Sequence, residues 1–572
     1  NVTPQVLLLN PINSFYLGLA LSILGCHRDQ NTEKMPVKPW QEIRDAKKAE
    51  QASRIPAAWK IRPEDFPPDE TVDLRPVAAS SGILSTRELK ITGEEYDATS
   101  LAVAIAEGAY SAEEVATAFC KRAAIGHQLC NTLTEIMFQD AIEDAKKLDA
   151  YFRETGKTVG PLHGLPMTFK ECFHVCGYDA CNGYISRAFN PSTTTTYIIE
   201  LVKAAGAVVI SKTNVPQTML VCETDNNVFG RTKNSVVSHL TCGGSSGGEG
   251  SNMAFRGSAI GIGTDVAGSI RIPAAANGVY GFKPTSGVLP FIGYAASGYT
   301  GVNCGIPATL GPLANSARDL ALLVRGIRDA KPWRVDPGVI PNICEQGTST
   351  RKPVIGIIAQ SGLTPHPPVQ RAIKEAAAKL QGAGFEVKDF TPPNFADIRS
   401  VTQELLTLDS MSYQKYELSK GGEPVVPSVV NIGFWDLPTK TQEETWAWNT
   451  KRLAFCKAML DRWQETKVDV VICPAGPYSA ALPGGWIHEL YTSTWNAMDY
   501  PAAIIPFTKA DPKLDPRDSS FVPLNSMDTI NEAKYDPQLM AGVPVALQIV
   551  GRKYGDEQLL KDVETIDMVL NA

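Results

Sequence analysis

Two serines and one lysine lie in segments where they could carry out nucleophilic chemistry. Ser245 lies in GGSSGG, Ser269 follows in TDVAGSIR, and Lys170 lies upstream in GLPMTFK. A serine hydroxyl attacks a carbonyl group when a base takes its proton. A buried lysine can be that base, because desolvation disfavours the charged ammonium and lowers its pKa toward neutrality. Taken alone, Lys170 would be interpreted as a lysine that extends to the surface, but the three residues together predict a hydrolase with a serine nucleophile.

The stretch from residue 241 to 273 is unusually rich in glycine, serine and other small residues. Glycine lets the backbone approach a ligand closely, so N–H groups can be brought against a substrate oxygen. Residues 258–263 are predicted to form a strand whose two glycines allow close packing. The chain must then turn sharply, and successive N–H groups in such a turn can form an oxyanion hole. Its predicted members are Val266, Ala267, Gly268 and Ser269.

The three segments, in this order, resemble the motifs of the amidase signature family. The Ser-Ser-Lys hydrolases of that family carry G-x-P-x-x-x-K, GGSSGG and D-x-G-G-S-[IV]-R. The resemblance is closest to the fungal general amidase or acetamidase branch and runs from about Lys38 to the C-terminus. It implies an α/β fold in which a central mixed, twisted β-sheet is covered by helices on both faces. It also implies an enzyme without a cofactor that cleaves a carboxylic acid amide to a carboxylate and ammonia or an amine.

The resemblance also implies a role for each matching residue. Neutral Lys170 draws a proton through Ser245, and Ser269 attacks the amide carbonyl to form an acyl-enzyme. Residues implied to contact the substrate are Met219, Leu220, Gly243 and Gly244. Residues implied to support the two loops are Ser246, Thr264, Asp265 and Arg271. Two positions depart from the common pattern: Ala267 replaces the first glycine of G-G-S, which requires a negative φ there, and Glu171 follows the lysine where aspartate is frequent.

Secondary-structure signals predict the elements that must position these residues. Residues 161–169 are expected to form a strand that delivers Lys170 into the interior, and a helix over 194–205 followed by a strand over 207–210 indicates layered α/β architecture. Further helices are expected at 111–124, after a Ser-x-x-Glu start signal, and at 137–152 and 367–380. Further strands are expected at 352–358, 385–390, 469–474, 502–507 and 544–550.

Composition is that of a globular protein with a sizeable core. Of the 572 residues, 44% are hydrophobic and 20% are charged, and the net charge is −7 with basic residues scattered along the chain. Nucleic acid is therefore an unexpected partner. Because no linker or charge run divides the chain, residues 35–572 are predicted to form one amidase domain, with a catalytic core at about 90–310 and a substrate-variable region at about 390–500. A homodimer is also expected.

Residues 1–34 are predicted to be a non-native or weakly structured extension. Their apolar run at 15–26 is too short to span a bilayer and has no basic residue before it. A membrane-facing hairpin or anchor is the alternative interpretation of this run. Twelve cysteines are too few for a disulfide scaffold, which favours a reduced, cytoplasmic protein. Cys172, Cys176 and Cys181, with His174 nearby, fit no common zinc spacing and are interpreted as small buried side chains.

Several functional alternatives stay open at this point. GSSGG also fits the G-x-S-x-G pattern of serine esterases, with Ser246 as the nucleophile, but no clear strand precedes it and only His366 and His488 follow. The same motifs occur in the amidase subunit of the tRNA-dependent amidotransferase, although the acidic surface favours a stand-alone enzyme. Met219, Leu220 and the downstream tryptophans favour uncharged carboxamides, whereas the apolar N-terminal run and the aromatic residues of 401–455 leave long-chain fatty amides open. Short or aromatic acyl groups are expected, with fatty acid amide hydrolysis as the alternative.

Overall fold

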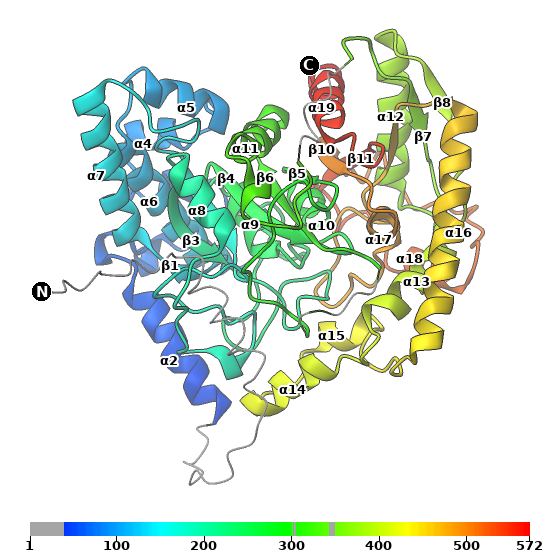
Figure 1. The fold of residues 1–572 in the computed structure, drawn as a ribbon, viewed down its shortest axis with the longest axis horizontal. Coiled ribbons are helices and arrows are strands. Elements are labelled where there is room, and N and C mark those ends of the chain that lie inside the picture. The colour runs from blue at the N-terminus through cyan, green and yellow to red at the C-terminus, as the bar shows by residue number, and fades with distance from the viewer. Residues whose placement is uncertain (1–38, 300, 302–304, 342–348) are drawn as a thin grey trace, which may run out of the picture. The chain divides into compact units, whose positions relative to one another are not determined.

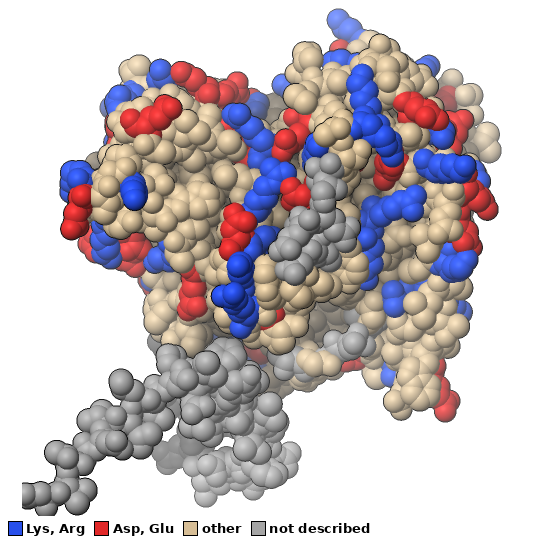
Figure 2. Space-filling model, turned by 45° about the horizontal axis from the view of Figure 1, so that its top comes forward, with Lys and Arg blue, Asp and Glu red and all other residues tan. Residues whose placement is uncertain are grey.

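The computed structural model describes residues 39–299, 301, 305–341 and 349–572. The predictions for the N-terminal extension and its apolar run lie outside these residues. Residues 40–572 form one compact unit. No helix among the described residues is both long and apolar enough to cross a membrane. On the face shown in Figure 2, lysine and arginine side chains are interspersed with aspartate and glutamate.

A single mixed sheet runs through this unit (Figure 1). Its eleven strands lie in the order β1-β3-β2-β4-β6-β5-β10-β11-β9-β7-β8. The pairs β2–β3, β2–β4, β7–β8 and β7–β9 are parallel, and the remaining neighbours are antiparallel. The strands are β1 (Leu133–Ile136), β2 (Pro166–Lys170), β3 (Val208–Thr213), β4 (Ile260–Asp265), β5 (Tyr280–Lys283), β6 (Thr309–Ala314), β7 (Ile355–Ile357), β8 (Val387–Asp389), β9 (Val470–Pro474), β10 (Ala502–Lys509) and β11 (Pro544–Val550).

Helices cover both faces of the sheet, which confirms the predicted α/β class. Helices α9 and α10 pack on one face, whereas α8, α11, α12 and α19 pack on the other. The α-helices are α2 (Trp40–Ser53), α3 (Val77–Ser80), α4 (Thr86–Ile91), α5 (Ala98–Ala106), α6 (Ala112–Cys130), α7 (Phe138–Thr155), α8 (Tyr197–Ala204), α9 (Gly247–Ala254), α10 (Arg271–Asn277), α11 (Ala317–Asp329), α12 (Pro367–Gly382), α13 (Phe395–Leu406), α14 (Ser412–Gly421), α15 (Pro427–Asn431), α16 (Gln442–Thr466), α17 (Leu490–Ala497), α18 (Ser526–Ala533) and α19 (Asp556–Leu570). Four short 3-10 helices join them: η1 (Ala57–Trp59), η2 (Pro63–Asp65), η3 (Ile185–Arg187) and η4 (Pro332–Arg334).

Local signals in the sequence explain where several helices begin and end. Ser111 caps α6 by accepting a hydrogen bond from the N–H of Glu114, which leaves one fewer unpaired donor at that end. Gly156 ends α7 with a φ of 65°, a conformation that glycine adopts without strain. Pro367 stands at the first position of α12, where its missing N–H costs nothing. These boundaries lie close to the predicted ones, although α6 continues to Cys130.

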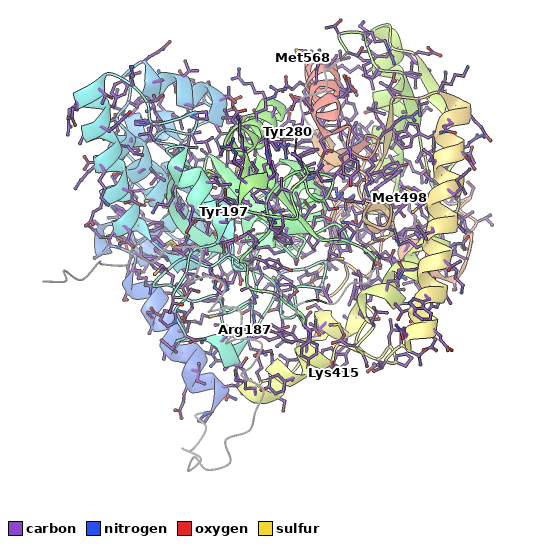
Figure 3. All side chains as sticks on the ribbon, viewed as in Figure 1. Arg187, Tyr197, Tyr280, Lys415, Met498 and Met568 are labelled. Atoms are coloured by element: carbon purple, nitrogen blue, oxygen red, sulfur yellow. The ribbon has the colours of Figure 1, made fainter. Side chains whose placement is uncertain are left out.

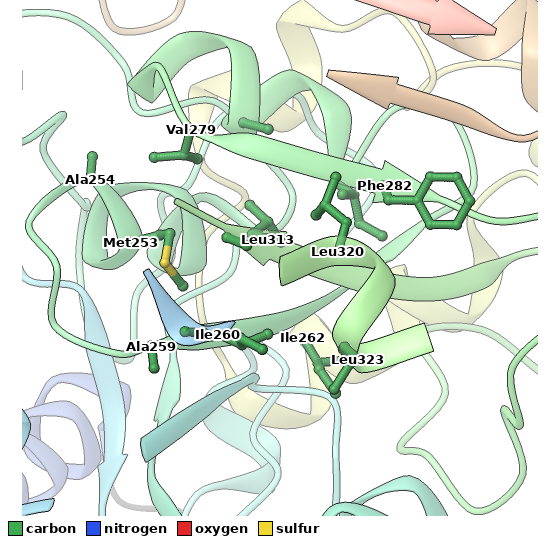
Figure 4. Packing of buried hydrophobic residues seen from close by; sticks show 14 of the residues in the cluster. Met253, Ala254, Ala259, Ile260, Ile262, Val279, Phe282, Leu313, Leu320 and Leu323 are labelled. Carbon is green, nitrogen blue, oxygen red and sulfur yellow. The ribbon is translucent and has the colours of Figure 1, made fainter. Parts of the chain in front are cut away.

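Strand β4 divides its residues between the two faces of the sheet. Ile260 and Ile262 point into the main core, together with Leu320 and Leu323 of α11 (Figure 4). Side chains alternate along a strand, so Gly261 faces the opposite side, toward α9. A Cβ atom at Gly261 would lie only 2.1 Å from a carboxyl oxygen of Glu249. Glycine at this position therefore allows α9 and the segment that precedes it to lie directly on the backbone of the sheet.

We expect Gly261→Ala to lower the free energy of unfolding by about 1 to 3 kcal/mol, because the added methyl group overpacks a filled interior. The measurement is a urea titration followed by circular dichroism. Gly382→Ala is the matched control, since a Cβ atom at the exposed Gly382 would meet no other atom within 4 Å. Equal losses in the two variants would contradict the close packing of α9 on β4.

Candidate active site

Lys170 lies at the end of β2 with its side chain buried. Its Nζ is 2.7 Å from the hydroxyl of Ser245 and 2.8 Å from the hydroxyl of Thr264. Alternation along β2 places Thr168 and Lys170 on the α9 side of the sheet and Phe169 in the core. Burial lowers the pKa of Lys170 to about 8, although nearby Asp265 and Glu249 act in the opposite direction. The lysine is therefore held in place by two hydroxyl groups in an environment that favours its neutral form.

The Ser245 loop packs closely against the main chain of other segments. Gly243 has a φ of 74°, and the peptide bond between Gly244 and Ser245 is cis. A Cβ atom on Gly243 would lie 2.9 Å from the Cα of Pro273. A Cβ atom on Gly244 would lie 2.3 Å from the carbonyl oxygen of Glu223. Both glycines are thus packed against neighbouring main chain. Neither lines the cavity beside Ser269, although both were predicted to contact the substrate.

Ser246 joins the two serine loops. Its N–H donates to the carbonyl oxygen of Ser269 at 3.1 Å, and its buried hydroxyl accepts a hydrogen bond from the N–H of Thr264 at 3.3 Å. No strand is formed by residues 241–246, so the strand-to-helix elbow of a G-x-S-x-G esterase is absent here. These contacts agree with a supporting position for Ser246.

The Ser269 loop begins where β4 ends. Gly268 has a φ of 130°, while Ala267 is not among the residues with positive φ. Alanine is therefore tolerated at the position where the family pattern has glycine. The N–H of Gly268 donates to Asp265 at 2.8 Å, so it is engaged within the protein. The described hydrogen bonds leave the N–H groups of Val266, Ala267 and Ser269 without a protein acceptor, which reduces the predicted oxyanion donors from four to three.

Asp265 and Arg271 form a buried ion pair beneath this loop. The carboxylate accepts from Nη2 of Arg271 at 2.9 Å and from the side-chain amide of Asn496 at 2.8 Å. It also accepts from the N–H of Ile270 at 3.1 Å. Arg271 in turn donates to Gln548 at 2.7 Å. Despite desolvation, the Arg271 guanidinium holds the pKa of Asp265 well below its usual range, so a charged pair with every oxygen in a hydrogen bond fixes the turn.

A narrow cavity of about 20 Å3 lies beside Ser269. Met219 and Leu220, the two side chains expected to contact the substrate, line it. Ser269 itself is half-buried, and Met219 has a φ of 57°. The remaining lining residues are Val221, Cys222, Val266, Ala267, Ile272, Ile432, Phe434 and Glu489. A cavity of this size holds about one water molecule or methyl group, and its wall is apolar apart from Ser269 and Glu489.

Two glutamates that sequence reasoning did not single out lie close to the reacting groups. Glu249 of α9 accepts hydrogen bonds from Thr168 at 2.7 Å and Thr213 at 2.9 Å. Burial raises its pKa to about 8. Glu489 lies on the cavity wall, more than 200 residues after Ser269 in the chain. A helical spacing from Ser245 could have indicated Glu249, but no local pattern connects Glu489 with this site.

Glu171, which stands where the family pattern often has aspartate, is explained by its contacts. Its carboxylate lies 3.3 Å from Nζ of Lys212 and accepts from the N–H of Cys181 at 2.7 Å and from the hydroxyl of Thr134. All of these partners are buried. The longer side chain of glutamate therefore links β2 to β1, β3 and the segment after β2, and it does not reach the serines.

The aromatic residues of 401–455 do not share one role. Phe434 lines the cavity beside Ser269, whereas Trp446 and Tyr416 are exposed by 58% and 59%. Arg187 lies beside α14, the helix that carries Lys415 (Figure 3), and contacts Tyr413 and Glu417 of that helix. Most of this region is thus packing or surface, and one of its aromatic side chains reaches the site.

The cysteines and histidines form no metal site in the described part of the chain, where no group of three potential ligands occurs. Cys172 and Cys181 are buried, but Cys176 is exposed, which differs from its interpretation as a buried side chain. His366 is hydrogen-bonded through Nε2, which lies 2.9 Å from the carbonyl oxygen of Asn531. Its imidazole is therefore occupied away from the serines.

The chain is similar to known amidases over most of its length. A family model described as Amidase matches residues 114–560. An acetamidase of Aspergillus oryzae is 35% identical over 556 residues, covering 94% of this chain and 100% of the relative. An amidase of Gibberella moniliformis is 36% identical over 542 residues, covering 93% of this chain and 99% of the relative.

Solved structures show the same similarity in three dimensions. A fatty acid amide hydrolase superposes with a TM-score of 0.87 at 30% identity, covering 94% of this chain and 96% of that chain. A bacterial aryl acylamidase has a TM-score of 0.64 at 18% identity, covering 83% of this chain and 96% of that chain, and so shares the fold. With its family model matched over most of its length and its relatives matched end to end, this chain belongs to the amidase signature family.

Proposed function

We propose that this enzyme hydrolyses small uncharged carboxamides through an acyl-enzyme on Ser269. One observation carries the proposal: a buried lysine with a lowered pKa donates to Ser245, in a loop hydrogen-bonded to the Ser269 loop, and Ser269 lines a cavity. A base such as Lys170, a serine such as Ser245 that relays the proton, and a nucleophile such as Ser269 can together move a proton to an amide nitrogen. The amidase names of the whole-length relatives support the same reaction class.

In the proposed mechanism, neutral Lys170 accepts the proton of Ser245, and Ser245 accepts the proton of Ser269. The Ser269 oxygen forms a bond to the amide carbon, and the N–H groups of Val266, Ala267 and Ser269 stabilise the oxyanion. Ser245 then passes its proton to the amide nitrogen and is reprotonated by Lys170. The C–N bond breaks, ammonia or an amine leaves, and a water molecule hydrolyses the acyl-enzyme by the same proton route.

Three observations bear on the acyl group, and they do not all favour the same length. The narrow cavity beside Ser269 favours a short acyl group, as does the similarity to an acetamidase. The similarity to a fatty acid amide hydrolase favours a long one. We place short aliphatic amides before aromatic and long-chain amides, because the cavity belongs to this chain and has room for about one methyl group. A cytoplasmic homodimer remains part of the proposal.

The nucleophile can be identified by a fluorophosphonate probe and mass spectrometry of the labelled peptides. We expect one label, on Ser269, because the probe reacts with the activated serine. Ser269→Ala is expected to lose the label, and Ser246→Ala, which removes a supporting hydroxyl, is the matched control. A label on Ser246, or undiminished labelling of the Ser269→Ala variant, would contradict the assignment.

The pH dependence of kcat/KM reports the pKa of Lys170 in the enzyme without bound substrate. Because Lys170 acts in its neutral form and has a pKa of about 8, activity is expected to rise with pH and level off above about pH 8. In Thr264→Val the charged lysine loses an acceptor, so the midpoint moves to lower pH. The plateau falls by roughly 10- to 100-fold, because the lysine is less well oriented.

Thr264→Ser keeps the hydroxyl and serves as the control for this shift. It is expected to retain both the midpoint and most of the plateau. Melting temperatures of the three proteins separate a loss of orientation from a loss of folding. A midpoint that does not move in Thr264→Val would argue against Lys170 as the titrating base.

Acyl specificity can be measured as kcat/KM for acetamide, hexanoamide, benzamide and oleamide. We expect the value to be highest for acetamide, because the longer chains and the benzene ring exceed a cavity with room for about one methyl group. Burial of each additional methylene contributes about 0.8 kcal/mol, which is roughly a fourfold increase in kcat/KM. A steady rise toward oleamide would therefore replace the short-acyl assignment with a fatty-amide one.

A further inference from the structure

Glu489 is the one charged residue on the described wall of the cavity beside Ser269. It directly precedes α17, and only 2% of its surface is exposed. A buried carboxylate is costly unless its oxygens are paired and hydrogen-bonded. Its presence among Met219, Leu220 and Phe434 therefore calls for a partner.

Arg399 of α13 supplies part of that partnership. Its Nε lies 3.3 Å from both carboxylate oxygens of Glu489, but the geometry fits a hydrogen bond to Oε2 alone. The other donors of Arg399 go to the side chain of Gln403 at 3.1 Å and the carbonyl oxygen of Ile487 at 3.4 Å. Oε1 of Glu489 is buried and accepts no hydrogen bond within the described chain. Its one polar contact among the described residues is thus the ion pair with Arg399, and its capacity to accept a hydrogen bond is unused.

The position of Glu489 is fixed relative to the nucleophile. Its carbonyl oxygen accepts from the N–H groups of Thr492 and Ser493 in the first turn of α17. The hydroxyl of Thr492 then donates to the carbonyl oxygen of Ala267 at 2.7 Å, two residues before Ser269. The same turn accepts from Arg271 through the carbonyl oxygen of Thr492 at 2.9 Å. These contacts connect the main chain at Glu489, through Thr492, to the loop that carries the predicted oxyanion donors.

We infer that Glu489 determines substrate specificity by accepting a hydrogen bond at Oε1 from an N–H or O–H group of the bound substrate. This inference rests on the proposed amidase function. It narrows the substrate class to small amides that present a donor to the cavity and excludes those that present a carboxylate. A site built to accept such a bond strongly rejects an analogue without the donor, because its own buried oxygen then stays without a hydrogen bond.

Two parts of the substrate could supply the donor, namely the N–H of the scissile amide and a polar group on the acyl chain. The pair acetamide and methyl acetate tests the first, since the ester lacks the N–H. The pair 2-hydroxyacetamide and propanamide tests the second, since a hydroxyl replaces a methyl group of similar size. The selectivity of an enzyme is the ratio of kcat/KM within each pair.

Glu489→Leu is expected to reduce one of these ratios by roughly 10- to 100-fold, the value of a hydrogen bond to a charged group. Glu489→Gln keeps the size and one acceptor oxygen, so a smaller reduction in the same ratio is expected; it carries the test if the leucine variant does not fold. Gln403→Leu is the matched control, because it removes a contact of Arg399 without changing the cavity. This control is expected to keep both ratios.

The outcomes separate the two levels of the proposal. A lower ratio of acetamide to methyl acetate in the Glu489 variants places the donor on the scissile amide. A lower ratio of 2-hydroxyacetamide to propanamide places it on the acyl chain. If the wild-type enzyme turns over these compounds and both ratios stay unchanged in folded Glu489 variants, the role of Glu489 is overturned and the proposed amidase function is not. A wild-type enzyme that hydrolyses none of the four compounds overturns the proposed function, and the inference with it.

Discussion

The hydrogen bonds of a buried lysine organise the centre of this protein. Lys170 has no carboxylate as a direct partner in the described part of the chain; its Nζ lies between the hydroxyl groups of Ser245 and Thr264. A carboxylate in that place would stabilise the ammonium and make the lysine a poor base. The charged groups of the region are paired elsewhere: Asp265 with Arg271, and Glu171 with Lys212. The buried ion pairs of this region thus do not include Lys170.

The alternation of side chains in β2, β3 and β4 makes this arrangement possible. The same face of the sheet presents Thr168, Lys170 and Thr213, and where β4 passes beneath α9 it presents glycine. The other face presents aliphatic side chains to α11. A single period of two residues therefore supplies both the core and the polar floor of the site.

The order of motifs and the periodicity of side chains predicted much of this fold. β11 occurs at the predicted residues, and α12 begins at the predicted proline, because local burial and turn chemistry decide such elements. The use of the Gly268 N–H by Asp265 could not be predicted, since it depends on the path of the turn after β4. The position of Glu489 is a tertiary property for the same reason. Gly243 and Gly244 show the ambiguity of glycine, which permits contact with a ligand and with neighbouring backbone equally well.

Part of the cavity wall comes from a different half of the chain than Lys170, Ser245 and Ser269 do. Lys170 and Ser245 belong to the first half and are mounted on the sheet, whereas Ile432, Phe434 and Glu489 arrive from segments outside it. Substitutions at Ile432 or Phe434 can therefore reshape this part of the wall without changing Lys170, Ser245 or Ser269. In engineering terms, a library confined to positions such as Ile432 and Phe434 can vary part of the cavity wall while Lys170, Ser245 and Ser269 stay unchanged.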